Sequence, residues 1–239
     1  MKNLTLLALF VSLLSLPTLA DQIACEQSRK GLLADDLLKK LTVKICTHKF
    51  SADPDVYMEY DKAYESKSAQ DFLVYEYTNE CYQNLNNELF KTENQNQDTL
   101  KLAEQLDAVL CDFPIAKEDV YRGAKLPDAV VENYLKAEEI SIPAFTSTSK
   151  AFHIACEFAK KNGNTFMKIT SKSGRAIEKQ SMHEEELEVL FRTNARFKVK
   201  IAESGFQASI RSGCKGVSHY FELEEIYTEE EMKPFVWPY

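Results

Sequence analysis

The sequence is poor in basic residues, in histidine and in long hydrophobic runs. It contains 29 Lys and Arg against 37 Asp and Glu, which gives a formal net charge of −8. Nucleic acids and anionic membranes bind a concentrated basic face, so this acidic balance argues against such partners. The four histidines are scattered, and no two cysteines lie at the short spacing of a zinc site. No metal is therefore expected.

One hydrophobic run is present, at the N-terminus. Lys2 precedes an apolar stretch from Leu4 to Leu16, and Thr18-Leu19-Ala20 follows as a small-residue cleavage site. Residues 1–20 thus have the pattern of a signal peptide, and an uncleaved anchor is the alternative. The run is shorter than the roughly 20 residues that span a membrane. The C-terminus is acidic and aromatic, without a glycolipid-anchor signal, so we expect a secreted product with no stable membrane anchor.

All six cysteines follow the expected cleavage site, and an even number suits disulfides in an oxidising compartment. Spacing alone does not choose among the possible pairings. Cys111 with Cys156 is one candidate, because each cysteine flanks a predicted site element. The alternative is that Cys156 is a small buried apolar residue in a helix.

The hydrophobic pattern changes character near residue 118. Before that point apolar residues recur at helical spacing, and after it short strand-like runs separate turn residues. We therefore expect an α+β fold in a single domain, residues 21–239, with a helical lobe over about 21–117 and a sheet-rich half over about 118–239. The helical rows include Leu73, Tyr77, Cys81, Leu85 and Leu89, and then Leu102, Leu106, Val109 and Leu110. The expected strands are 165–170, 186–191, 196–202 and 219–226.

The most informative run is Glu186-Leu187-Glu188-Val189-Leu190-Phe191. In a strand the two carboxylates would project from one face, about 7 Å apart, while Leu187, Val189 and Phe191 fill the other face. Such a pair can divide labour, one acid stabilising an electron-poor sugar carbon and the other orienting a nucleophile. Glu184 and Glu185 extend the acidic run, so a solvated edge strand is the alternative.

Two further motifs precede this run, Val120-Tyr121-Arg122-Gly123 and Phe145-Thr146-Ser147-Thr148-Ser149. In their order and spacing the three motifs resemble the arginine, serine and Glu-x-Glu signature of arginine-specific mono-ADP-ribosyltransferases, in the secreted and cell-surface branch related to cholera-toxin-like enzymes. Tyr77-Thr78 with the later Asn86 resembles a helical segment of that branch. The resemblance covers roughly residues 70 to 226.

The resemblance implies an ADP-ribosyltransferase-like fold, with a helical N-terminal lobe packed on two mostly antiparallel β-sheets around a central NAD cleft. NAD is then a consumed substrate, and no other cofactor is implied. The lack of a Gly-x-Gly-x-x-Gly fingerprint is therefore no objection. The implied partner is an acceptor protein that carries the target arginine, and we expect the enzyme to act as a monomer.

The resemblance also assigns roles to the two acids. Glu188 would stabilise the positive charge that develops on the anomeric carbon as nicotinamide leaves, and would hold a ribose hydroxyl. Glu186 would bind the acceptor guanidinium and orient one nitrogen toward the ribose. Glutamine at that position resembles relatives that use other acceptors or water. If the register shifts, Glu184 or Glu185 takes the place of Glu186.

Four other residues are candidates for binding NAD. Arg122 would clamp a phosphate or ribose hydroxyls through its planar donors, the alternative being a strand arginine paired with a surface acid. Gly123 would let its backbone approach the nicotinamide amide, unless it only forms a tight turn. Ser147 would hydrogen-bond the catalytic carboxylate or the ribose. Arg175 could reach a phosphate, although an exposed loop arginine is the commoner case.

Three rival functions stay open at this point. Water could replace arginine in an NAD glycohydrolase, although Glu186 has little purpose without a cationic acceptor. A secreted binding domain without activity is the second rival, and the intact Arg122, Ser147 and Glu188 argue against it. A glycosidase also uses paired carboxylates but leaves the arginine and serine motifs unexplained. Residues 178–185 correspond to the acceptor-recognition loop of the family, and their sequence names no target.

Overall fold

The computed structural model describes residues 25–46 and 62–227 of the 239-residue chain. The predicted signal peptide, residues 1–20, lies outside these residues. Among the described helices, none is long and apolar enough to cross a membrane.

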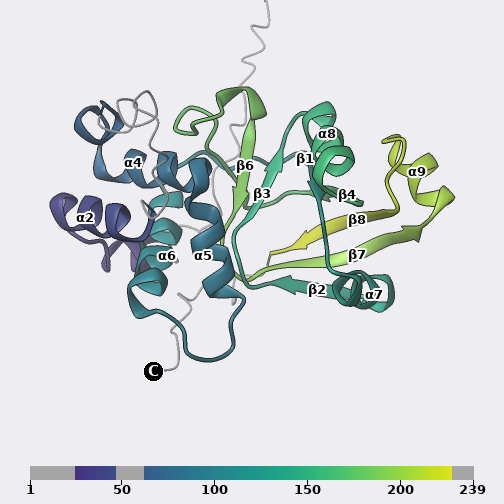
Figure 1. Ribbon diagram of the computed structural model, residues 1–239, viewed down its shortest axis with the longest axis horizontal. Helices are drawn as coiled ribbons and strands as arrows, with labels where there is room; N and C mark the ends of the chain where they lie inside the picture. The colour runs from purple at the N-terminus through teal and green to yellow at the C-terminus, as the bar shows by residue number, and fades with distance from the viewer. Residues whose placement is uncertain (1–24, 47–61, 228–239) are drawn as a thin grey trace, which may run out of the picture.

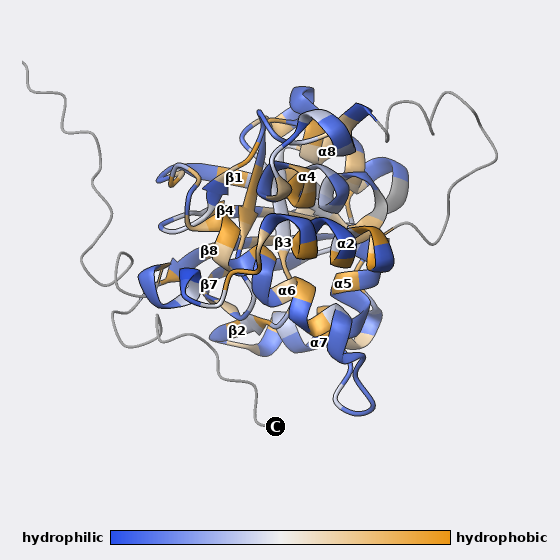
Figure 2. Cartoon of the chain, turned by 90° about the vertical axis from the view of Figure 1, so that its left-hand side faces the viewer, coloured by the Kyte–Doolittle hydropathy of each residue, from blue (hydrophilic) through white to orange (hydrophobic). Residues whose placement is uncertain are grey.

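Helices from the first half of the chain form one lobe, on the left of Figure 1. They are amphipathic, as the mixed colouring of Figure 2 shows, and their apolar faces meet in a core that includes the fully buried Leu73, Leu85, Leu102 and Leu106. The elements are α2 (Asp35–Cys46), α4 (Ala69–Glu76), η1 (Tyr77–Cys81), α5 (Tyr82–Leu89) and α6 (Gln97–Leu110). The expected helical lobe is therefore present.

The elements α4, η1 and α5 follow one another without a break, and η1 is a π-helical turn. Ser68 caps the start of α4 by accepting a hydrogen bond from the Asp71 amide. Single π turns inside helices commonly occur at functional sites, because the extra residue changes which side chains face a neighbour. Here the turn begins at Tyr77 and ends at Cys81.

Within the described residues, the second half of the chain contributes one sheet of eight strands in the order β2-β7-β8-β4-β1-β3-β6-β5. The β4–β8 pair is parallel and the other pairs are antiparallel. The strands are β1 (Asp119–Ala124), β2 (Glu139–Ile142), β3 (Thr146–Ser149), β4 (Thr165–Thr170), β5 (Arg175–Ala176), β6 (Glu188–Phe191), β7 (Ala195–Ser204) and β8 (His219–Ile226). The α+β class and the mostly antiparallel pairing are confirmed.

The sheet corrects the prediction of two separate sheets. Strands β1 and β3 are joined through one residue pair, Tyr121 with Ser149, whereas β1 and β4 pair along six residues. The sheet thus has a five-strand part and a three-strand part, and β3 and β6 stand between the helical lobe and the five-strand part in Figure 1. The short junction is why the two parts form one hydrogen-bonded sheet.

In the part of the chain that the structure describes, three helices cover the sheet: α7 (Asp128–Lys136), α8 (Phe152–Asn162) and α9 (Phe206–Ser212). Helix α8 lies directly against β1 at Gly123. A Cβ atom at Gly123 would come within 2.0 Å of the Ala155 carbonyl oxygen and 2.3 Å of the Ala159 nitrogen. Glycine is therefore required here for the helix to approach the strand, which is a packing reason for this residue in the Arg122-Gly123 motif.

The six cysteines form three disulfides, Cys25–Cys111, Cys46–Cys81 and Cys156–Cys214. The proposed Cys111–Cys156 pair is wrong. Cys111 ends α6 beside the first described residues, while Cys156 on α8 faces the turn that follows α9. The spacing of the cysteines in the sequence does not show which of them are close in space, because each disulfide joins two segments that meet only through tertiary packing.

Candidate active site

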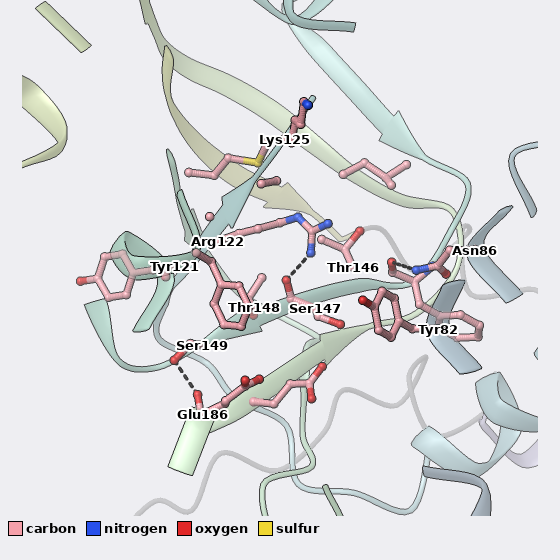
Figure 3. Close-up of a pocket in the computed structure, with 18 of the residues that line it drawn as sticks. Tyr82, Asn86, Tyr121, Arg122, Lys125, Thr146, Ser147, Thr148, Ser149 and Glu186 are labelled. Atoms are coloured by element: carbon pink, nitrogen blue, oxygen red, sulfur yellow. Dashed lines mark hydrogen bonds between the residues drawn. The ribbon is translucent and has the colours of Figure 1, made fainter. Parts of the chain in front are cut away.

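A cleft of about 790 Å³ lies between the helical lobe and the sheet. Its lining includes Tyr77 and Asn86 from the helices and Arg122, Ser147 and Glu188 from β1, β3 and β6. A volume of this size suits a small molecule or cofactor, and few polar groups converge in such pockets. Figure 3 shows the Arg122 side chain reaching the main-chain carbonyl oxygen of Ser147, with Asn86 entering from the helical lobe.

Glu188 is the first residue of β6 and has an exposed fraction of 6%. Both faces of this strand are covered: Leu190 packs in the core of the helical lobe, while Val189 and Phe191 pack in the core beneath the sheet. All four residues of β6 are consequently buried. The Glu188 carboxylate at the start of this strand is therefore largely shielded from solvent.

Burial raises the pKa of Glu188 to about 7. A hydrogen bond with the Ser147 side chain and the charge of Arg122 lower this pKa, whereas the charge of Glu186 raises it. A carboxyl group that titrates near neutral pH in a cleft is typical of functional sites. The two lowering effects favour the ionised form of the carboxyl group.

Arg122 and Ser147 meet across the junction between the two parts of the sheet. The Arg122 Nη1 atom donates a hydrogen bond to the Ser147 carbonyl oxygen at 2.5 Å. Burial lowers the pKa of the Arg122 guanidinium, while Tyr77, Tyr134 and Glu188 raise it. An arginine stays charged in proteins, so Arg122 supplies a positive charge at the floor of the cleft.

Glu186 does not lie in the strand, which corrects the predicted alternation. It ends the 3₁₀ turn η2 (Glu184–Glu186), and Leu187 follows with a left-handed backbone, φ 48°. Leu187 is 41% exposed and does not share the buried face of Val189 and Phe191. The predicted start of the strand at residue 186 was wrong because β6 is covered on both faces. Its sequence therefore does not alternate between apolar and polar residues, and such alternation would have marked the first residue that pairs with β3.

Glu186 nevertheless lines the cleft together with Glu188. Ser149 donates a hydrogen bond from its hydroxyl to the Glu186 carbonyl oxygen at 2.6 Å (Figure 3). Glu184 and Glu185 are exposed and are not part of the cleft lining, so the structure separates Glu186 from its acidic neighbours. Burial raises the pKa of Glu186, His183 lowers it and Glu185 raises it further.

Arg175 is not in the cleft. It lies on β5 with an exposed fraction of 3%, and its Nη1 atom donates to the Phe113 carbonyl oxygen at 3.1 Å. Its Nη2 atom contacts the Cys25 sulfur at 3.7 Å. The expected phosphate contact therefore has no support in this geometry, and neither does an exposed loop position. The residue connects the sheet edge to the N-terminal disulfide.

Asn86 and Tyr77 join the helical lobe to the serine strand, and no role was assigned to either from the sequence. The Asn86 side chain donates to the Phe145 carbonyl oxygen at 3.3 Å and accepts from the Phe145 amide at 3.2 Å. Its Nδ2 atom also donates to the Tyr77 hydroxyl at 3.4 Å. In the sequence, the Tyr77-Thr78 segment and the later Asn86 indicated only a resemblance to the family. They did not predict the contact between Asn86 and Phe145.

The segment between β5 and β6 is fastened to both sides of the cleft. The Met182 amide donates to the Thr78 hydroxyl at 2.9 Å, and Lys150 forms an ion pair of 3.0 Å with Glu178. The Lys150 amide donates to the Leu187 carbonyl oxygen at 3.1 Å. These contacts hold the turn that carries Glu186 beside the π turn η1.

Several solved structures of other proteins have the same fold as this chain. XopAI, a type III effector from Xanthomonas axonopodis pv. citri, superposes with a TM-score of 0.61 at 16% identity, covering 87% of this chain and 90% of that one. Exoenzyme S from Pseudomonas aeruginosa, solved with human 14-3-3 protein beta and bound to carba-NAD, has a TM-score of 0.56 at 20% identity, over 81% and 89% of the two chains.

A third structure is the ADP-ribosyltransferase Vis from Vibrio splendidus in complex with agmatine. It has a TM-score of 0.54 at 19% identity and covers 90% of each chain. At these identities the likeness shows the fold alone, and it confirms the expected ADP-ribosyltransferase-like fold.

Sequence comparison identifies the family. A Mycobacterium avium (strain 104) protein named as the NAD(+)–arginine ADP-ribosyltransferase Mav is 34% identical over 128 residues, which span 52% of this chain and 15% of that longer protein. The family model for ART, NAD:arginine ADP-ribosyltransferase, matches residues 57–211, which include the arginine, serine and Glu-x-Glu motifs. The chain belongs to the NAD:arginine ADP-ribosyltransferase family.

Proposed function

We propose that this protein is a secreted enzyme that transfers ADP-ribose from NAD to an arginine side chain of an acceptor protein. The observation that carries the proposal is the meeting of four residues in one cleft. Glu188, Ser147, Arg122 and a second carboxylate, Glu186, line the same cleft. Burial raises the pKa of Glu188, and Ser147 and the positive charge of Arg122 lower it.

The first half of the reaction breaks the bond between the nicotinamide nitrogen and the ribose anomeric carbon. Both electrons of the bond leave with nicotinamide, and positive charge develops on the ribose. In this role Glu188 stabilises that charge, and Arg122 binds a phosphate or ribose hydroxyl of NAD. Gly123 keeps β1 close to α8 and leaves its backbone at the cleft. The bound carba-NAD of exoenzyme S supports an NAD site in this fold.

The second half forms the bond to the acceptor. A guanidinium nitrogen attacks the anomeric carbon and loses a proton, so the net products are nicotinamide, ADP-ribosyl-arginine and one proton. Glu186 suits the acceptor side, because it lies in the exposed turn η2 while its carboxylate reaches the cleft. Agmatine, which carries a guanidinium group, is bound by Vis, and this supports an arginine-like acceptor.

Two features support the proposed secretion. Residues 1–20 have the pattern of a signal peptide, and all six cysteines are paired in disulfides, which persist in oxidising compartments. Protein isolated from a culture medium should then begin at Asp21 on N-terminal sequencing. Recovery of the full chain with Met1 in the cell fraction would contradict export. We further propose that the exported enzyme acts as a monomer.

The proposed activity is tested by incubating the purified, disulfide-bonded protein with NAD, with and without agmatine. Nicotinamide release and the mass of agmatine products are measured together. We expect an ADP-ribosyl-agmatine adduct and faster nicotinamide release in the presence of agmatine. Equal release without any adduct would identify an NAD glycohydrolase, and no release under either condition would identify a binding protein.

A further inference from the structure

The segment between β5 and β6, residues 177–187, carries Glu186 and is bonded to the sheet where it enters β6. The Ser149 hydroxyl donates to the Glu186 carbonyl oxygen at 2.6 Å, and the Lys150 amide donates to the Leu187 carbonyl oxygen at 3.1 Å. Both hydrogen bonds lie at one end of the segment. The position of its middle part, around Met182, therefore depends on other contacts.

The middle of the segment is bonded to the helical lobe through Thr78, the second residue of the π turn η1. The Met182 amide donates to the Thr78 hydroxyl oxygen at 2.9 Å, and this hydroxyl donates its own proton to the Tyr75 carbonyl oxygen at 2.9 Å. A hydroxyl has one proton and a backbone amide only donates, so the two bonds are compatible. Among the hydrogen bonds of the described residues, Thr78 to Met182 is the one that joins segment 177–187 to the helical lobe.

A hydrogen-bonded turn connects Met182 to Glu186. The Glu186 amide donates to the His183 carbonyl oxygen at 3.1 Å, and the Leu187 amide donates to the Glu184 carbonyl oxygen at 3.2 Å. These bonds close the 3₁₀ turn η2 directly after Met182, so a shift at the start of the turn also moves its end. The anchored Met182 amide thus helps to fix the place of the Glu186 carboxylate in the cleft.

We infer that Thr78 is a positioning residue that determines how well the cleft uses arginine instead of water as the acceptor. By holding the Met182 amide, Thr78 keeps the turn η2 where Glu186 meets the acceptor guanidinium. The inference rests on the proposed function. When the turn is not held, water attacks the anomeric carbon and loses a proton, and the products are free ADP-ribose, nicotinamide and one proton.

The inference predicts a selective loss of transfer in Thr78→Val. This substitution removes the hydroxyl and keeps the size and branching of the side chain. The value of kcat/KM for agmatine should fall about fivefold to tenfold, the effect of one hydrogen bond, and the ratio of adduct to free ADP-ribose should fall with it. Nicotinamide release without agmatine should stay near the wild-type rate, because Glu188 and Arg122 are unchanged. Thr78→Ser keeps the hydroxyl and should restore transfer.

The experiment measures adduct, free ADP-ribose and nicotinamide for wild type, Thr78→Val and Thr78→Ser at several agmatine concentrations. Thr42→Val is the matched control, because Thr42 lies on α2 in the same lobe and does not line the cleft. Its hydroxyl also donates to a helix carbonyl oxygen, that of Leu38, at 2.9 Å. Thr42→Val should keep the wild-type product ratio.

Equal losses of transfer and hydrolysis in Thr78→Val would overturn the inference, and so would a loss of transfer in Thr78→Ser as large as in Thr78→Val. If Thr78→Val does not fold, Thr78→Ser and Thr78→Ala make the same comparison, since these two variants differ only in the hydroxyl.

Hydrogen exchange of the Met182 amide is a second readout that needs no turnover. The chain has five methionines, so nitrogen-15 labelling of methionine gives few NMR signals, and Met182→Leu assigns the signal of Met182. This amide should exchange several-fold faster in Thr78→Val than in wild type and Thr78→Ser. If wild type forms no agmatine adduct, the proposed function is wrong, while faster exchange in Thr78→Val still supports the hold of Thr78 on the turn. Equal exchange in wild type and Thr78→Val would refute it.

Discussion

Glu186 and Glu188 are two residues apart in the chain but lie in different surroundings. Glu188 is the first residue of a strand that is buried on both faces, and burial raises the pKa of its carboxyl group while Ser147 of the neighbouring strand lowers it. Glu186 ends an exposed acidic turn, and the left-handed Leu187 separates it from the strand. The comparison teaches that a short motif can place one buried and one accessible carboxylate in the same cleft, which suits the proposed division between NAD and the acceptor.

The largest expected effect is on the buried member of the pair. Glu188→Gln should lower nicotinamide release by about 10³-fold, because a neutral amide cannot stabilise the developing positive charge. Initial rates with saturating NAD, with and without agmatine, measure this loss. A residual rate within tenfold of wild type would show that Glu188 is not the catalytic carboxylate.

The two positions should also differ in their effect on stability. Burial raises the pKa of Glu188 to about 7, so between the unfolded value near 4.5 and pH 7 the folded chain holds a proton that the unfolded chain has lost. Wild type therefore loses stability as pH rises through this window. Glu188→Gln should be more stable than wild type by on the order of 3 kcal/mol at pH 8, with no gain below about pH 4.5.

Urea unfolding of wild type, Glu188→Gln and Glu186→Gln at pH 4.5 and pH 8 checks this difference. Glu186→Gln should give a smaller gain, because Glu186 is half-buried. Equal gains at both positions, or a gain for Glu188→Gln that does not depend on pH, would contradict the assignment of a strongly desolvated Glu188.

Substitution of Glu186, the more exposed carboxylate, should reduce transfer to the acceptor rather than cleavage of NAD. Glu186→Gln should lower adduct formation with agmatine by roughly 10- to 100-fold, the value of one charge-assisted hydrogen bond, while hydrolysis of NAD continues. Glu185→Gln is the matched control, since Glu185 is a neighbouring exposed acid that does not line the cleft. Parallel losses of transfer and hydrolysis in Glu186→Gln would argue against an acceptor role.

The smallest effect concerns the hydrogen bond that fastens the turn to the sheet. Ser149 donates to the Glu186 carbonyl oxygen at 2.6 Å and accepts from the Ala151 amide at 2.9 Å. Ser149→Ala should cost about 1 kcal/mol of stability and lower transfer a few-fold, with hydrolysis nearly unchanged. Thermal unfolding and the agmatine assay measure the two effects. A loss of hydrolysis equal to that of transfer would show that Ser149 supports the NAD side instead.

Much of this site was predictable because its chemistry needs particular residue types in a particular order. Arg122, Ser147 and Glu188 were identified from three motifs, and the structure brings all three into one cleft. The helical rows were also readable, since Leu73, Leu85, Leu102 and Leu106 are buried at the expected spacing. Local periodicity and side-chain chemistry are properties that a sequence expresses directly.

The remaining features depend on tertiary contacts. A leucine with φ 48° at position 187 carries no sequence signal, because this backbone region is unfavourable for leucine and is imposed by the fold. The disulfide pairs and the burial of Arg175 likewise depend on which segments pack together. The joining of two sheet parts into one depends on a single residue pair, Tyr121 with Ser149.

The π turn was not predicted, although the four-residue repeat of the helical row is compatible with it. Tyr77, Cys81, Leu85 and Leu89 repeat every four residues and are all buried. On a regular α-helix such a row rotates by about 40° at each step, and so leaves the core within a few turns. One inserted residue takes up part of this rotation, and it also places Tyr77 toward the cleft and Cys81 toward Cys46.

The division of labour between the two carboxylates is tested most directly by the ratio of arginine transfer to NAD hydrolysis. We would measure agmatine adduct and free ADP-ribose in the same reaction for wild type, Glu186→Gln and Glu188→Gln. The account predicts that transfer dominates in wild type, that hydrolysis dominates in Glu186→Gln, and that both products nearly vanish in Glu188→Gln. An unchanged ratio in Glu186→Gln would contradict it.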